Sequence, residues 1–222
     1  MRGFRLSAPG GRRLALLLAL SLAAVRRAPS ATIDRVAALV DRQVLTVSEV
    51  SQMADIRFFP RLAAQSDDDH RRFILDSLIA QALRFRDVER FGAEDVSKDS
   101  IEARLLQIQK RFASPAEFTA TLQRAQLSLD EVRALVKRQL QVEGYIQERF
   151  APMIFVSTDE IEAYYRGTWS QQRRQRGLPV PQLSEVQDEI RTLLKSTRLQ
   201  QEVDKWTTQL RSRANVDVYT WR

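Results

Sequence analysis

The sequence has no cysteine, one histidine, and only seven glycines and seven prolines in 222 residues. Without cysteine the chain can form neither a disulfide nor a lipid-modified cysteine anchor, so its stability must come from packing. With one histidine and no thiol, few candidates remain for nucleophilic catalysis. The low glycine and proline content and the 44% share of hydrophobic residues exclude a low-complexity chain and allow one sizeable core or two small ones.

Known catalytic motifs are also missing. The sequence has no glycine-rich phosphate loop, no Gly-x-Ser-x-Gly and no histidine or cysteine spacing typical of a metal site. His70 follows three aspartates, 67–69, and such a cluster could in principle bind a metal. Four consecutive residues at a helix start point in different directions, however, and helix capping accounts for all of them. We therefore predict no catalytic residue, no metal and no cofactor.

The net charge of +7 is unevenly distributed along the chain. Residues 1–31 contain six arginines and no acidic residue, so the remainder has 29 basic and 28 acidic side chains. A net charge of +1 for this remainder removes most of the electrostatic argument for nucleic acid as a partner.

The first 31 residues have the layout of a secretory signal peptide. A basic start up to Arg13 precedes the apolar run from Leu14 to Val25, and small residues follow at 28–31. As a helix, the twelve residues of this run would extend only about 18 Å, whereas the hydrocarbon layer of a bilayer is roughly 30 Å thick. A stable membrane span is therefore the weaker interpretation, and we expect cleavage near residues 30–31 and export.

An amphipathic pattern from Arg71 to Phe91 predicts the central helix of the fold. It carries two adjacent apolar rows, namely Ile74, Leu78 and Ala82, and beside them Leu75, Ile79 and Leu83. A helix of this length extends about 30 Å, which is too long for one neighbour to cover. Several other segments should therefore pack along it.

Capping signals and apolar periodicity predict further helices on both sides of the central one. Four residues lie three positions before a glutamate, which is the spacing of a capping box: Thr46, Ser114, Ser128 and Ser157. Ser97 is a further candidate for a helix cap. A long amphipathic helix is expected from Ser184 to Ala214. Short strands are predicted at residues 36–40, 44–45 and 216–220. Because a lone terminal strand needs a partner, we predict a mainly α fold in which the N-terminal strands and the C-terminal strand form a small β-sheet.

The stretch from Gly167 to Pro181 has no helical periodicity and contains two glycines and two prolines. We interpret it as a flexible connection. Its basic cluster, Arg173, Arg174 and Arg176, could bind an anionic surface, but basic residues in a mobile loop are usually solvated, and we favour that interpretation.

Five segments, in this order, carry a resemblance to a known family: IDRVAALVDRQVLTVSEV, LDSLIAQAL, LSLDEVRALVKRQLQVEGYIQERF, VSTDEIEAYYRG and LSEVQDEIRTLLKSTRLQQEVDKWTTQLRSRANVDVY. The chain resembles the SurA-type periplasmic chaperones and related peptidyl-prolyl isomerases. The segments cover nearly all of the mature chain, and they are patterns of apolar residues rather than catalytic signatures.

The resemblance implies a helical SurA-like chaperone core. Its expected parts are a signal peptide (1–31), a helical domain like the N-terminal domain of SurA (32–166), a flexible linker (167–182), and a C-terminal helix and strand that complete the core (183–222). Family members usually carry parvulin isomerase domains where this chain has only the linker, and a parvulin site typically uses paired histidines. We therefore expect a chaperone core without the isomerase domain, and no enzymatic activity.

The resemblance also implies a periplasmic holdase that binds unfolded outer-membrane or envelope polypeptides through an apolar surface, without ATP. Position and chemistry suggest six client contacts: Met53, Phe58, Phe59, Met153, Phe155 and Trp169. For the apolar stretches at 58–59 and 153–156 we favour the interpretation that they cover the core, and the functional alternative is an exposed patch for an apolar partner. Two other functions remain open: a peptidyl-prolyl isomerase with an unrecognised site, and a dedicated subunit that holds one folded partner.

Overall fold

A computed structural model describes residues 34–219, so the predicted signal peptide lies outside the described residues. The described part is mainly helical with one small sheet, which confirms the predicted fold class. The elements in chain order are β1 (Val36–Val40), β2 (Gln43–Thr46), α1 (Val47–Asp55), α2 (Asp67–Phe91), α3 (Lys98–Gln109), α4 (Pro115–Arg124), α5 (Leu129–Arg149), η1 (Ala151–Met153), α6 (Thr158–Tyr164), η2 (Tyr165–Trp169), α7 (Ser170–Gln175), α8 (Leu183–Arg213) and β3 (Val216–Val218).

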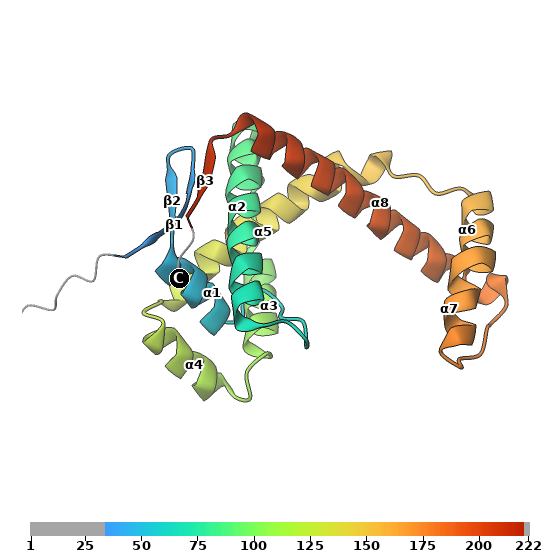
Figure 1. Cartoon of the computed structure of the whole chain (residues 1–222), viewed down its shortest axis with the longest axis horizontal. Coiled ribbons are helices and arrows are strands. Elements are labelled where there is room, and N and C mark those ends of the chain that lie inside the picture. Colours follow the sequence, from blue (N-terminus) through green and yellow to red (C-terminus); the bar gives the residue numbers. More distant parts are fainter. Residues whose placement is uncertain (1–33, 220–222) are drawn as a thin grey trace, which may run out of the picture. The chain divides into compact units, whose positions relative to one another are not determined.

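The two ends of the described chain meet in a three-stranded antiparallel sheet of order β2-β1-β3 (Figure 1). The central strand β1 pairs with β2 through a tight turn at Asp41, which has a positive φ of 51°. On its other side β1 pairs with β3, and Leu39 lies opposite Asp217. The predicted pairing of the terminal strand with the N-terminal strands is therefore confirmed.

Serine and threonine caps start the helices where the sequence predicts them. The side chains of Thr46, Ser128 and Ser157 each accept a hydrogen bond from the amide of a glutamate three residues later, and each glutamate bonds back to the cap amide. Ser66 caps α2 by accepting from the Asp69 amide, so the aspartates of the first turn lie at the positive end of the helix dipole. Gly92, with a φ of 89°, ends α2.

Helix α2 is the element around which the main core forms. The buried apolar residues of α2 are Ile74, Leu75, Ile79, Leu83 and Val88, which are drawn largely from the two predicted rows. All but Val88 belong to a cluster that includes side chains of β1, α1, α3, α4 and α5. Several elements therefore pack along α2, as its length requires.

Helix α8 contributes to two smaller clusters at different points along its length. Its second half places Val203 and Trp206 against Val88 of α2 and against α5. Two hydrogen bonds stabilise this contact. The Trp206 indole donates to the Asp87 carboxylate at 3.1 Å, and Arg84 donates to the Thr207 hydroxyl at 2.7 Å. Its first half packs against α6 (Figure 1), and Val186 and Ile190 share a cluster with Ile161.

The stretch that we expected to be an irregular connection is helical over most of its first half. Residues 165–169 form the π-helical turn η2, and α7 continues from it to residue 175. A π-turn adds a residue to the turn and breaks the 3.6-residue period, so a periodicity search misses it. Arg173 is not a solvated loop residue either, because its Nε donates to the Pro179 carbonyl at 2.7 Å and its guanidinium lies 4.8 Å from the centre of the Trp169 ring.

None of the helices within residues 34–219 combines the length and the apolar character that crossing a membrane requires.

The pairing of β3 with β1 can be tested with two proline substitutions. Backbone bonds from Asp41 to Asn215 and from Tyr219 to Ala37 flank Asp217, so alternation along the ladder places Asp217 in a hydrogen-bonded pair. We expect Asp217→Pro to lower the free energy of unfolding by about 1–3 kcal/mol, measured by urea denaturation, since it removes a ladder donor.

Val218→Pro is the matched control. Val218 lies in a non-hydrogen-bonded pair on an edge strand, so its N–H points away from β1 and proline is tolerated there. Equal stability of the two variants would contradict the role of this ladder.

Candidate functional site

The main candidate site is a groove of about 450 Å³ along α2, α5 and α8, which we call the aromatic groove. Its apolar lining residues are Phe59, Phe73, Ala80, Val142 and Ile146, and its polar lining residues are Asp76, Ser77, Gln81, Arg84, Gln139, Glu143 and Gln200. Phe73 is 42% exposed although it lies on the central helix. The groove therefore offers apolar and amide side chains to a ligand.

The charged residues of the aromatic groove already have partners within the fold. Arg104 makes a two-pronged pair with Glu143, with N–O distances of 2.9 and 2.7 Å, and this pairing raises the pKa of Arg104. Asp76 lies 3.9 Å from Arg211. Burial lowers the pKa of Arg84, which donates to a threonine hydroxyl. Two of the three charged lining residues, Glu143 and Asp76, are thus in ion pairs, and the third, Arg84, is held by a hydroxyl.

Two aromatic side chains form one wall of the groove. The rings of Phe59 and Phe73 lie edge to face with 6.3 Å between centroids, and Phe58 contacts Phe59 in the same geometry at 5.2 Å. Phe58 is buried in the main core, whereas Phe59 is half-buried. Phe58 thus packs in the core and contacts Phe59, while Phe59 and Phe73 line the groove.

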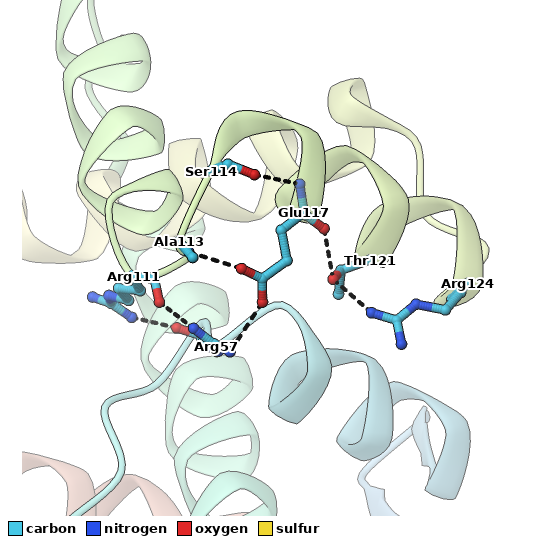
Figure 2. Close-up of polar contacts among 7 residues, drawn as sticks. All are labelled: Arg57, Arg111, Ala113, Ser114, Glu117, Thr121 and Arg124. Carbon is cyan, nitrogen blue, oxygen red and sulfur yellow. Dashed lines mark hydrogen bonds and ion pairs between the residues drawn. The ribbon is translucent and has the colours of Figure 1, made fainter.

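An exchange of hydrogen bonds between two arginines holds the chain segment that carries Phe58 and Phe59 (Figure 2). Arg111, in the turn between α3 and α4, donates to the carbonyl of Arg57. It also donates to the carbonyl of Phe58 at 2.8 Å. Arg57 donates in return to the carbonyl of Arg111, and its guanidinium lies 4.4 Å from the centre of the Phe112 ring. Arg57 has a positive φ of 52°, and these contacts offset the cost of that backbone conformation.

Glu117 connects the same clamp to the start of α4 (Figure 2). Ser114 caps α4 by accepting from the Glu117 amide at 3.1 Å. The Glu117 carboxylate accepts from the amide of Ala113 at 2.8 Å rather than from the cap amide, so the reciprocal bond of the expected capping box shifts by one residue. Its other oxygen lies 3.4 Å from Arg57. The α1–α2 connection is thereby fixed to α4.

Three of the six predicted client contacts are buried. Met53 and Phe58 belong to the main core, and Trp169 packs with Val186 and Ile190 of α8. The prediction that these three side chains are exposed is wrong. An apolar residue beside a helix breaker can turn inward as readily as outward, and these three pack into the core. They cannot contact a client in this conformation.

The other three predicted contacts are accessible and fall into two places. Phe59 lies at the aromatic groove. Met153 and Phe155, which are 65% and 75% exposed, lie between α5 and α6, away from the residues that line the groove. The six residues therefore do not form one surface.

Phe73 is the groove residue that our sequence prediction missed. It lies on α2 directly before Ile74 and outside both apolar rows. A large aromatic residue on the outer face of a helix was the signal that could have identified it.

The exposed segment around Phe155 is held by Arg198 of α8. Arg198 donates to the Phe155 carbonyl and to both oxygens of Glu160, the capping-box residue of α6. The hydrogen bond from Arg198, together with the bond from the Ser157 amide, lowers the pKa of Glu160 from 4.5 to about 2. One carboxylate therefore both caps α6 and attaches it to α8.

No group of three or more histidine, cysteine, aspartate or glutamate side chains in the part of the chain covered by the structure is arranged to hold a metal ion. His70 stacks on Phe73 with 6.3 Å between ring centroids, and Asp67, Asp68 and Asp69 occupy the first turn of α2.

The arginine clamp predicts a specific local effect. Arg111→Ala removes the donors to the carbonyls of Arg57 and Phe58, so we expect the free energy of unfolding to fall by about 1–3 kcal/mol. Amide exchange at residues 57–59 should become faster than in the unmodified protein. Lys110→Ala, which changes an exposed neighbour in the same turn, should leave both measurements unchanged. Slower or unchanged exchange in Arg111→Ala would contradict the clamp.

The low pKa of Glu160 predicts an acid-dependent weakening of α6. A carboxylate whose pKa is depressed in the folded state stabilises that state above its unfolded pKa, and the effect is lost as the pH falls through the folded pKa. Hydrogen-exchange protection of α6 should therefore be constant above pH 4.5 and decrease between pH 4.5 and about 2. Glu160→Gln should reduce protection already at neutral pH, whereas Glu162→Gln, on the same helix, should not. A flat profile in the unmodified protein would refute the assignment.

Comparison with known proteins finds a similarity to a chaperone. Over 144 residues, 63% of this chain, the sequence is 26% identical to "Chaperone SurA" of Saccharophagus degradans, and the matched region makes up 33% of that protein. No protein-family model matches the chain. The chain thus spans about a third of the length of this curated relative, and the similarity supports a SurA-like family relationship.

Proposed function

We propose that the protein is a periplasmic holdase that binds unfolded outer-membrane or envelope polypeptides without ATP. The aromatic groove is the observation that carries this proposal. It combines two accessible phenylalanine rings with amide side chains, and its charged residues have partners within the fold. Such a lining suits extended chains of varied sequence, because rings supply apolar contact and amides can pair with a peptide backbone.

The similarity to a protein named a chaperone supports the same function. That relative is longer than the matched region, so the role of the module common to both is itself part of the proposal. The signal-peptide layout of residues 1–31 supports a periplasmic location.

Binding should be weak enough for a client to leave without an energy source. We therefore propose micromolar affinities, roughly −8 kcal/mol. The groove holds about 450 Å³, enough for a few side chains of a client. Exposed Met153 and Phe155 offer a second apolar contact for the same client, and the unbranched methionine side chain adapts to different partners.

We also propose that the protein acts by binding and not by catalysis. A prolyl isomerase or a dedicated subunit remains an outcome of the following tests rather than a separate proposal. Acceleration of cis-trans exchange in a proline peptide would overturn the non-enzymatic function, and co-purification with one folded partner at fixed stoichiometry would favour the subunit.

Binding of a fluorescent unfolded outer-membrane protein tests the function and the groove together. The unmodified protein should bind it with micromolar affinity, should also bind an unrelated unfolded chain, and should not bind a folded control protein. Phe73→Ala should weaken binding about tenfold, since covering an aromatic ring contributes about 1.5 kcal/mol. Its thermal midpoint should change little because the ring is half outside the core.

Phe91→Ala is the matched control for this experiment. Phe91 is the same residue type on the same helix, 63% exposed, and it does not line the groove. It should bind clients like the unmodified protein. Equal losses in both variants would remove the groove from the proposal, and absence of binding to any unfolded chain would refute the holdase function.

A further inference from the structure

A second cleft, of about 610 Å³, adjoins the aromatic groove, and we call it the arginine cleft. It lies where the end of α1, the α1–α2 connection, the start of α2 and the α3–α4 turn come together. Its charged lining residues are Arg57, Arg61, Arg71, Arg111, Asp55 and Asp67. Four guanidinium groups face two carboxylates, so the lining carries a net positive charge.

Two of these arginines have no carboxylate partner among the described residues. Arg57 lies 3.4 Å from Glu117 and Arg61 lies 2.7 Å from Asp67. Within residues 34–219, by contrast, neither Arg71 nor Arg111 takes part in an ion pair. Arg111 donates only to backbone carbonyls, and burial, with a smaller contribution from Arg104, lowers its pKa. Arg111 is nevertheless an exposed residue, so its guanidinium remains accessible to a ligand.

His70 also lines the cleft, and one of its ring nitrogens is buried without a partner within residues 34–219. The residue is only 6% exposed, and its Nδ1 has no hydrogen-bond partner among the described residues. Burial, helped by the positive charge of Arg61, lowers the pKa of His70 and so favours the neutral ring. A neutral imidazole carries its proton on one of the two nitrogens, and Nδ1 can therefore donate to an oxygen. A buried polar atom without a partner is costly unless a ligand satisfies it.

The arginine cleft and the aromatic groove share a wall. Phe59 lines both of them, and His70 in the cleft stacks on Phe73 in the groove with an interplanar angle of 18°. A ligand seated against Phe59 therefore borders both the groove and the cleft.

We propose that the arginine cleft binds a carboxylate of the client polypeptide while an aromatic side chain of the same client occupies the aromatic groove. This inference rests on the proposed function and narrows its clients to segments in which aromatic and acidic groups are neighbours. The planar guanidinium fork matches the two oxygens of a carboxylate, and Arg71 and Arg111 supply the uncompensated charge. The carboxylate comes from an aspartate or glutamate side chain or from the C-terminus of the client.

The test uses twelve-residue rhodamine-labelled peptides with blocked ends and binding measured by anisotropy at low salt. One peptide contains two phenylalanines beside two glutamates, a second replaces the glutamates by glutamine, and a third has alanine in place of phenylalanine. A fourth keeps glutamine but has a free C-terminal carboxylate next to the phenylalanines. We expect the acidic aromatic peptide to bind about fivefold tighter than its glutamine counterpart.

Two variants locate the preference. Arg71 is exposed and makes no ion pair within residues 34–219, so Arg71→Gln should reduce the preference for the acidic peptide without changing the thermal midpoint. Arg72→Gln removes the same charge from the next residue of α2, which does not line the cleft, and should retain the preference. Arg71→Glu should reverse it, so that a fifth peptide, with lysine in place of both glutamates, binds better than the glutamate peptide.

The outcomes separate this inference from the proposed function. Equal binding of the glutamate and glutamine peptides, or equal effects of Arg71→Gln and Arg72→Gln, would overturn the carboxylate site and leave the holdase function intact. Failure of every aromatic peptide to bind would instead refute the function on which the inference rests. If the free C-terminus restores tight binding to the glutamine peptide, the chain terminus is a source of the carboxylate.

Discussion

The burial of α2 on several sides at once is the constraint on which the other features depend. Its five buried aliphatic side chains contribute on the order of 10 kcal/mol at about 2 kcal/mol each, comparable with the whole net stability of a domain. Covering them takes residues from both ends of the described chain, since β1 and α8 both reach α2. What α2 leaves uncovered, Phe73 above all, then forms the wall of the aromatic groove.

Arginine side chains determine how the uncovered surface is divided. Arg57 and Arg111 fix the short segment that turns Phe58 inward and Phe59 toward the surface. Arg104 forms an ion pair with Glu143, so Glu143 brings little unpaired negative charge to the aromatic groove. Arg71 and Arg111 have no such partner within residues 34–219, so the cleft keeps positive charge. Apolar and anionic contacts for one extended ligand thus lie side by side, with Phe59 between them.

The functional residues were harder to predict than the elements that carry them. Capping serines and glutamates act over three residues, so helix starts such as Thr46 and Ser128 can be identified from local sequence. Whether a side chain faces solvent depends on what packs against it. Phe58 and Phe59 are adjacent and identical in type, yet one is in the core and the other at the groove. The π-turn at residues 165–169 shows the same limit for helices that depart from the regular period.

The sequence by itself determined the mainly α class, the positions of the central and C-terminal helices, and the need for the terminal strand to find a partner, because period and capping are local properties. Only the tertiary structure decided that residues as distant as Phe59, Val142 and Gln200 line one groove. It alone also decided which charges are neutralised, since Arg104 finds Glu143 on another helix whereas Arg71 finds no carboxylate within residues 34–219. Burial and ion pairing depend on distances between segments far apart in the chain, and no local pattern encodes those distances.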